Sequence, residues 1–253
     1  MLSFFEDFIL VVFTVSAALI FMVGLNRAWP AEKRRNHNEL IGWQLSILGT
    51  TYAVILGFML YTVWTDFGVA DVNVDQEASA LSNIYALAGG LPEPQRSQMK
   101  TLARSYADAA VRVDWPEMSA GHTPEATFEI NNRMWTTLMS LHSSSATEVI
   151  AEDHSLSELS ALTAHRRARL LQAAGRLPGV LWCVLLIGGV LTISSCCMFG
   201  SESPRLHAWQ VFAFSLLIAL ALVAIANINR PFQGGIHIDD LAFERVQQFI
   251  RGQ

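Results

Sequence analysis

The most informative feature of this 253-residue sequence is its shortage of charged residues, which make up only 15% of the chain. Soluble globular domains carry about 25% charged residues. Long stretches hold no charge at all, and the mean hydropathy is +0.33. The net charge of −5 leaves no basic face for the phosphates of a nucleic acid. These features exclude a disordered chain and a nucleic-acid-binding protein, and they indicate an integral membrane protein.

Patterns typical of metal sites and catalytic centres are also missing from the sequence. The three cysteines, Cys183, Cys196 and Cys197, lie in or beside one apolar stretch and form no CxxC pair. The seven histidines form no HxxxH or HExxH pair, and there is no GxSxG, P-loop or dinucleotide-binding motif. We therefore expect no metal, no cofactor and no enzymatic activity.

Four apolar runs are long enough to cross about 30 Å of hydrocarbon as α-helices. They cover residues 8–25, 45–66, 177–199 and 209–228. A helix satisfies its own backbone hydrogen bonds in lipid, so the fold class predicted is all-α, with four transmembrane helices. The parts expected are a transmembrane hairpin at 1–67, a helical extramembrane domain at 68–176, a second hairpin at 177–228 and an amphipathic tail at 229–253.

The segment between the second and third spans has helical periodicity throughout. The second span continues in this pattern as one long helix until Gly89-Gly90-Leu91-Pro92. Trp115-Pro116 is expected to break a later helix, and Thr123 with Pro124 to begin another. The tail predicts a short amphipathic helix, capped by Asp239, that can dock on the helices of the extramembrane domain.

Charge distribution predicts which parts of the chain face the cytoplasm. Four spans place the short loops 26–44 and 200–208 on one side, and both termini with the long segment on the other. The loops hold five of the 17 basic residues but only three of the 22 acidic residues. This bias predicts cytoplasmic short loops, with the helical domain on the opposite side. An arginine cluster before the third span favours the reverse orientation: Arg166, Arg167, Arg169 and Arg176.

Two faces of the second span are candidates for function. Small residues recur every four positions along one face, at Gly49, Ala53 and Gly57. They allow another helix to approach closely, either within one subunit or from further copies of the chain around an axis. Threonine and bulky apolar or aromatic residues lie along another face, at Thr50, Val54, Phe58 and Tyr61. That face could line a narrow pore, or it could meet lipid or another span.

The ionisable residues near these spans narrow the transport mechanism. None lies in the middle of a span, which argues against a proton pump or a coupled transporter but not against a passive channel. Three acidic residues follow the second span: Asp71, Asp75 and Glu77. In a homo-oligomer they would repeat around a pore mouth and attract cations. Alternatively they form a solvated face, or they pair with the arginine cluster before the third span.

Short motifs recur in a fixed order from about residue 36 to residue 240. They include His37-Asn38, GTTYAVILGF at 49–58, Glu77-Ala78, Leu91-Pro92-Glu93-Pro94, Tyr106, Trp115-Pro116, Arg166 with Arg169, Leu177-Pro178 and Arg230-Pro231-Phe232. As an ordered set they resemble the bestrophin-like domain family, a large group of bacterial membrane proteins of unknown function. This chain departs from the family pattern at Asn229, where an aspartate is expected.

The resemblance implies a bacterial inner membrane protein distantly related to bestrophins. Bestrophins are pentameric anion channels with four membrane helices per subunit and a helical region that is cytoplasmic, contrary to the charge count above. We therefore expect a homo-oligomeric passive ion channel whose second span lines the pore. The alternative is a membrane-anchored interaction or sensor module whose helical domain binds a protein partner. The partners expected are the lipid bilayer, further copies of the chain and ions.

Overall fold

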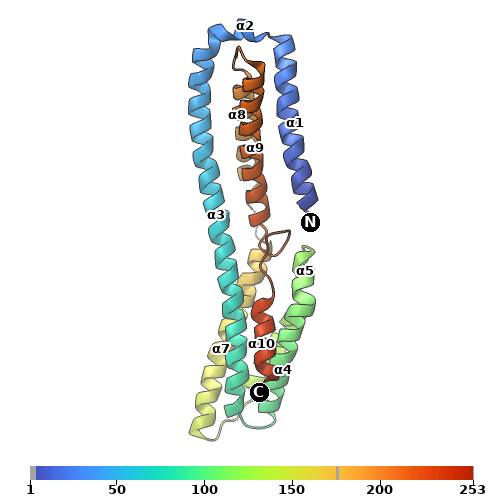
Figure 1. Cartoon of the computed structure of the whole chain (residues 1–253). Helices are drawn as coiled ribbons and strands as arrows, with labels where there is room; N and C mark the ends of the chain where they lie inside the picture. The colour runs from blue at the N-terminus through green and yellow to red at the C-terminus, as the bar shows by residue number, and fades with distance from the viewer. Residues whose placement is uncertain (1–3, 175–176, 253) are drawn as a thin grey trace. The chain divides into compact units, whose positions relative to one another are not determined.

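The structure, a computed structural model, describes residues 4–174 and 177–252 and contains only helices and connecting loops over these residues. The all-α prediction is therefore confirmed. The helices are α1 (Phe4–Ala28), α2 (Ala31–Arg34), η1 (Arg35–His37), α3 (Asn38–Leu87), η2 (Ala88–Gly90), α4 (Gln95–Ala109), η3 (Ala110–Asp114), α5 (Trp115–Ser119), α6 (Ala126–Met139), α7 (Ala146–Ala174), α8 (Gly179–Cys197), α9 (Pro204–Ile228) and α10 (Leu241–Arg251) (Figure 1).

Contacts divide the described chain into two units. The hairpin unit contains residues 4–65 and 177–229, and the helical unit contains residues 66–174 and 230–252. The helix α3 contributes to both, because its 50 residues run without a break to Leu87. The predicted continuation of the second span as one long helix is thus confirmed, and it ends beside Gly89 and Gly90, which lie in η2.

The hairpin unit is built from α1, the first half of α3, α8 and α9. Each of these four belongs to a helix long and apolar enough to cross a membrane, judged by length and composition. The helix α1 packs along α9 and α8, and these three lie side by side in Figure 1. A small apolar core joins them: Ala18, Met22, Cys196, Cys197 and Val211.

The two short loops of the hairpin unit are joined by specific hydrogen bonds. Buried Arg34 donates from Nη1 to the carbonyl of Cys197 at 2.8 Å, and from Nη2 to the side chain of Asn26. Asn38 and Gly200 exchange two hydrogen bonds of 2.8 Å each. A positive charge near the C-terminal end of a helix is also stabilised by the helix dipole. The two short loops, which the sequence predicts to lie on the same side of the membrane, therefore contact each other.

At its other end the hairpin unit is held by asparagine side chains. Asn227 donates to Asp7 Oδ2 at 2.8 Å, and the Leu177 amide donates to Asn229 Oδ1 at 3.2 Å. The Asn229 amide oxygen thus accepts a hydrogen bond that an aspartate carboxylate could equally accept. This contact accounts physically for an Asn–Asp exchange at that position.

The helical unit packs the second half of α3, α4 to α7 and α10 around one apolar core. α3 turns Val74, Leu81 and Ile84 inward, at the spacing of one helical face. The tail joins this core through α10, where the ring of Phe243 stacks on that of Tyr106 at a centroid distance of 6.3 Å. The amphipathic pattern of the tail therefore reflects burial against α4 and its neighbours.

Two expected helix starts differ from the structure. The helix predicted to begin at Thr123 and Pro124 begins at Ala126 instead, because the carbonyl of Pro124 faces the Arg166 guanidinium rather than starting the helical ladder. For α10, the residue in the cap position is Asp240. Asp239 still accepts a 3.2 Å hydrogen bond from the Leu241 amide through its side chain.

Candidate functional site

Both candidate faces of the second span lie on the surface of the hairpin unit. Val54, Phe58 and Tyr61 are between 52% and 70% exposed, and Thr50 is exposed beside them. On the small-residue face Ala53 is exposed as well.

The small residues leave room for another helix. A Cβ added at Gly49 or at Gly57 would meet no atom within 4 Å among the described parts of the chain. Over residues 4–174 and 177–252, no other helix therefore packs closely against these two glycines.

The face of α3 that does pack inward carries Tyr52. Its hydroxyl donates to the carbonyl of Leu185 at 2.8 Å, and the side chain is 4% exposed. Its ring fits against two glycines of α8, where a Cβ would come within 2.6 Å at Gly188 and 3.0 Å at Gly189. The inward side of this helix is thus fixed by one tyrosine and two facing glycines, to which the sequence pattern alone gave no role.

The three acidic residues after the second span do not share one environment. Asp71 and Asp75 are exposed, whereas Glu77 is completely buried. Glu77 therefore presents no charge at the surface of this chain, while the pore-mouth role of Asp71 and Asp75 stays a prediction. The reason for the burial of Glu77 is helical spacing, because Glu77 lies three residues after Val74 and four before Leu81, on the face that enters the core.

Glu77 instead forms a buried ion pair with Arg169. Arg169 Nε lies 2.7 Å from Glu77 Oε2, and Arg169 Nη2 lies 3.0 Å from Glu77 Oε1. Both side chains are 0% exposed. The two parallel contacts are the bidentate geometry that makes arginine–carboxylate pairs strong. The predicted pairing of the acidic residues with the arginine cluster is confirmed for this pair.

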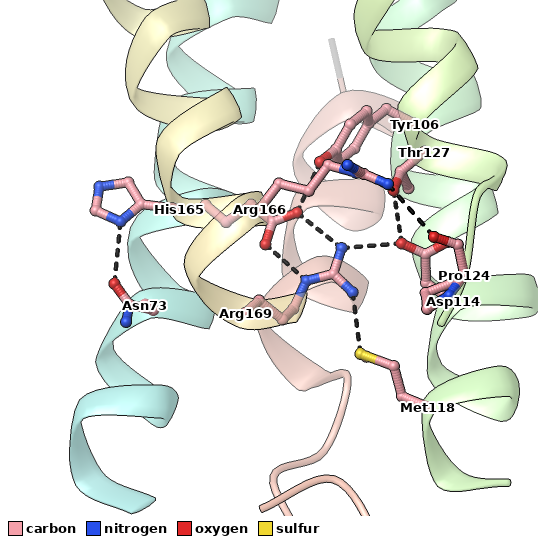
Figure 2. A network of polar contacts seen from close by, with 10 residues as sticks. Asn73, Tyr106, Asp114, Met118, Pro124, Thr127, His165, Arg166 and Arg169 are labelled. Atoms are coloured by element: carbon pink, nitrogen blue, oxygen red, sulfur yellow. Dashed lines mark hydrogen bonds and ion pairs between the residues drawn. The ribbon is translucent and has the colours of Figure 1, made fainter. Parts of the chain in front are cut away.

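Arg169 is the centre of a larger polar cluster. Its Nη2 also lies 2.9 Å from Asp114 Oδ2, and its Nη1 donates to Met118 Sδ at 3.4 Å (Figure 2). Tyr106 donates its hydroxyl hydrogen to Glu77 Oε1 at 2.7 Å. The guanidinium carbon also lies 5.0 Å from the ring centroid of Trp115. Arg169 therefore ties α7 to α3, η3 and α5.

Arg166 extends the cluster toward α6. Its Nε donates to Thr127 Oγ1 at 2.7 Å, and the Thr127 hydroxyl in turn donates to Asp114 Oδ2 at 2.6 Å. Figure 2 shows Arg166 and Arg169 one turn apart on α7, both directed at this group. Two guanidinium groups thus face two carboxylates, and the cluster is balanced in charge.

The cluster favours the charged form of Arg169 and the neutral form of Tyr106. Burial alone would lower the pKa of Arg169, but the Glu77 carboxylate, the hydrogen bonds to it and the Asp114 carboxylate raise that pKa above its ordinary value. Burial, followed by the charge of Glu77, raises the pKa of Tyr106 well above its ordinary value. Arg169 therefore stays charged and Tyr106 stays neutral near pH 7, which makes this pair unsuited to relaying protons.

The position of Asp114 depends on an irregular turn. Asp114 is the last residue of η3, a π-helical turn between α4 and α5. Its Oδ1 is buried and has no hydrogen-bond partner among residues 4–174 and 177–252. Such turns often occur at functional sites. Asp114 and Thr127 were not among the residues predicted from the sequence. The helix break expected at Trp115-Pro116 is wrong, because α4, η3 and α5 follow one another without a gap from Gln95 to Ser119, and the proline is tolerated in the first turn of α5 directly after the π-helical turn.

The described chain contains no candidate metal centre. Within residues 4–174 and 177–252, His, Cys, Asp and Glu side chains form no group of three that could hold a metal ion. The fold and the buried cluster, rather than a reactive centre, are therefore the features to compare with known proteins.

The comparisons connect this fold to one family. A search of curated proteins finds no match. Among solved structures, two variants of a bacterial bestrophin homolog from Klebsiella pneumoniae match with TM-scores of 0.68 and 0.70, at 15% and 12% sequence identity. These matches cover 96% and 97% of this chain and 99% of each homolog chain. A crystal structure of a membrane protein variant matches with a TM-score of 0.70 at 14% identity, covering 96% of this chain and 99% of that one.

These identities show a shared fold. The family itself is shown by the sequence, because the Bestrophin-like domain model matches residues 12–243. This range contains the contacts between the short loops, the exposed faces of α3 and the buried arginine cluster. The chain therefore belongs to the bestrophin-like domain family.

Proposed function

We propose that the protein is a homo-oligomeric passive ion channel in which α3 of each subunit lines the pore. The observation that carries this proposal is the uncovered outer side of α3 between Gly49 and Tyr61, opposite the buried Tyr52. In a single chain this part exposes small residues and, beside them, hydroxyl and aromatic groups. Membership of the bestrophin-like family and the shared fold support the same function.

The small-residue face provides a physical basis for assembly. Helices associate closely in lipid where Gly and Ala let their backbones approach. Copies of α3 that meet through Gly49, Ala53 and Gly57 around a closed axis would form a ring. Phe58 and Tyr61 would then narrow the central path, and Thr50 would supply a hydroxyl to it. Asp71 and Asp75 remain candidates for charges near the pore mouth.

The transport mechanism proposed is passive. The sequence of α3 from Ile41 to Thr65 contains no ionisable acidic or basic side chain, and α8 contains none between Gly179 and Cys197. A coupled transporter needs titratable or ion-binding groups within the membrane. A passive channel needs only a path whose width and polarity select the ion.

Assembly and conduction are tested with Gly57→Leu in the full-length protein. We expect the native protein to form a closed ring by native mass spectrometry and to pass ions in reconstituted liposomes. The larger side chain would separate the helices, so the variant should dissociate or lose flux. Gly24→Leu is the matched control, because a Cβ at Gly24 in α1 also meets nothing within 4 Å. A monomeric native protein that passes no ion would contradict the proposal, and cross-linking to a distinct partner would then favour the sensor alternative.

For location we propose a bacterial inner membrane with the short loops in the cytoplasm. The excess of basic residues in these loops supports this orientation. Single cysteines at Ser201 and Ser143, introduced in a cysteine-free background, would be labelled in intact cells by a membrane-impermeant reagent. We expect labelling at position 143 only, and labelling at position 201 only would reverse the orientation.

A further inference from the structure

A cavity of about 470 Å³ lies between α6 and α7 of the helical unit. Its size is typical of small-molecule sites, which measure about 300–1,000 Å³. The cavity is separate from the faces of α3 proposed to line a pore, because all of its lining residues lie between Thr123 and Ala174.

The wall of this cavity combines apolar surface with positive charge. Phe128, Trp135, Leu170 and Leu171 supply rings and aliphatic side chains. The indole nitrogen of Trp135 already donates to a threonine of α7 at 3.1 Å, so the ring itself presents apolar surface. Arginines are the charged residues of the lining, which includes no aspartate or glutamate among the described residues.

Arg166 is a preorganised cation at the base of this wall. It is 8% exposed, and its guanidinium is held by Thr127 and by the carbonyl of Pro124 (Figure 2). The ring of Phe128 also lies against it, with its centroid 5.5 Å from the guanidinium carbon. It forms no direct ion pair in the part of the chain that the structure describes. A fixed guanidinium without a carboxylate of its own is well suited to bind an anion.

Arg167 adds a second cation to the lining of the cavity. Its side chain is exposed and, over the described ranges, makes no salt bridge. Two arginines beside an aromatic and aliphatic wall complement a ligand that is negative at one end and apolar at the other.

We propose that this cavity binds an amphipathic anion, namely a carboxylate or phosphate group attached to an apolar body. The anionic group lies against Arg166 and Arg167, and the apolar body lies along Trp135 and the α7 leucines. This binding does not depend on ion conduction, so it can fail or succeed independently of the channel proposal.

The probe for this site is octanoate, titrated calorimetrically into the full-length protein in an uncharged detergent. Octanamide has the same apolar chain without the charge, and acetate has the charge without the chain. We expect octanoate to bind about tenfold more tightly than either, which corresponds to about 1.4 kcal/mol. Equal binding of octanoate and octanamide would overturn the proposal, as would the absence of octanoate binding.

The arginine requirement is tested with Arg167→Gln, which changes an exposed side chain and leaves the buried cluster intact. We expect it to weaken octanoate binding by about five- to tenfold, as for the loss of one ordinary hydrogen bond at an exposed position. Arg133→Gln makes the same change on an exposed residue of α6 that does not line the cavity. Equal effects of the two substitutions would overturn the proposal.

Competition in nanodiscs distinguishes the two natural sources of such an anion. If phosphatidylglycerol displaces octanoate and phosphatidylcholine does not, the ligand is an anionic lipid. If neither lipid displaces it, the ligand is a soluble organic acid. Both results support the site. Efficient cross-linking between copies through a cysteine at Leu171, with octanoate excluded, would instead show that a second chain covers the cavity.

Discussion

Replacing Arg169 by methionine is the most direct test of what the buried cluster contributes to stability. Arg169 is completely buried and makes three close contacts to carboxylate oxygens of Glu77 and Asp114. Methionine keeps much of the apolar stem but leaves two buried carboxylates without their central cation. Removing one partner of a buried ion pair costs about 3–5 kcal/mol of unfolding free energy.

The expected result can be measured by thermal unfolding of the detergent-solubilised protein, followed by intrinsic fluorescence. For chains of about this size 1 kcal/mol corresponds to roughly 2–4 °C. The Arg169→Met variant should therefore unfold about 6–20 °C below the native protein. Arg167→Met is the matched control, because the neighbouring arginine is exposed, and its effect should stay within about 0.5 kcal/mol.

A triple variant separates the free-energy cost of leaving buried charges unpaired from the stability that the contacts themselves contribute. Combining Arg169→Met with Glu77→Gln and Asp114→Asn removes the buried charges together with their partner. Replacing a whole buried ionic group is often far less harmful than breaking it. We expect the triple variant to recover at least part of the lost stability. A single variant as stable as the native protein, or a triple variant less stable than the single one, would refute this reasoning.

Two further substitutions test the contacts of each unit. Tyr106→Phe removes a 2.7 Å hydrogen bond to Glu77 and should cost about 1.5–3 kcal/mol. Because burial raises the pKa of Tyr106, this tyrosine ionises in the unfolded chain first as the pH rises through 10. The stability of the native protein therefore falls above that pH. The Tyr106→Phe variant should lose less stability than the native protein between pH 8 and 11 in the same unfolding assay. Gly200→Ala places a Cβ within 2.8 Å of two backbone atoms of the other short loop and should cost about 1–3 kcal/mol. Gly24→Ala, with open space around it, should be neutral or slightly stabilising, and equal melting temperatures of the two glycine variants would contradict the close loop packing.

The parts of the fold that follow from local pattern could be predicted from the sequence. Long uncharged runs gave the membrane-spanning candidates, and the spacing of Val74, Leu81 and their neighbours gave the extension of α3. The tail was recognisable because Phe243 and Val246 recur on one side of a short polar segment. Each of these signals arises from residues within a few turns of each other.

The inward face of the second span could not be predicted in the same way. The lipid around a membrane protein is as apolar as the protein core. Hydrophobicity therefore does not distinguish the helix face that packs inward from the face that meets lipid. The contact of Tyr52 with Gly188 and Gly189 depends on shape, and the partners are more than a hundred residues apart in sequence.

The buried cluster was only partly predictable for a related reason. An acidic residue after an apolar helix and an arginine cluster before another indicate that pairing is possible. They do not say which acid turns inward, because Glu77 and Arg169 are 92 residues apart. Asp114 was harder still, since a single carboxylate four residues after the buried Ala110 gives no sign of the arginine it meets 55 residues later in the chain.

The π-helical turn at Ala110–Asp114 has a consequence for how this chain tolerates deletions. A π-helical turn holds about one residue more than the α-helical turn it replaces, because its hydrogen bonds join residues five apart instead of four. Losing one residue there would therefore let the backbone return to a regular α-helical ladder, with the residues before and after the turn on nearly the same faces. A natural variant that is one residue shorter at this point would keep the apolar faces of α4 and α5 in place, and only the turn that carries Asp114 would have to be rearranged.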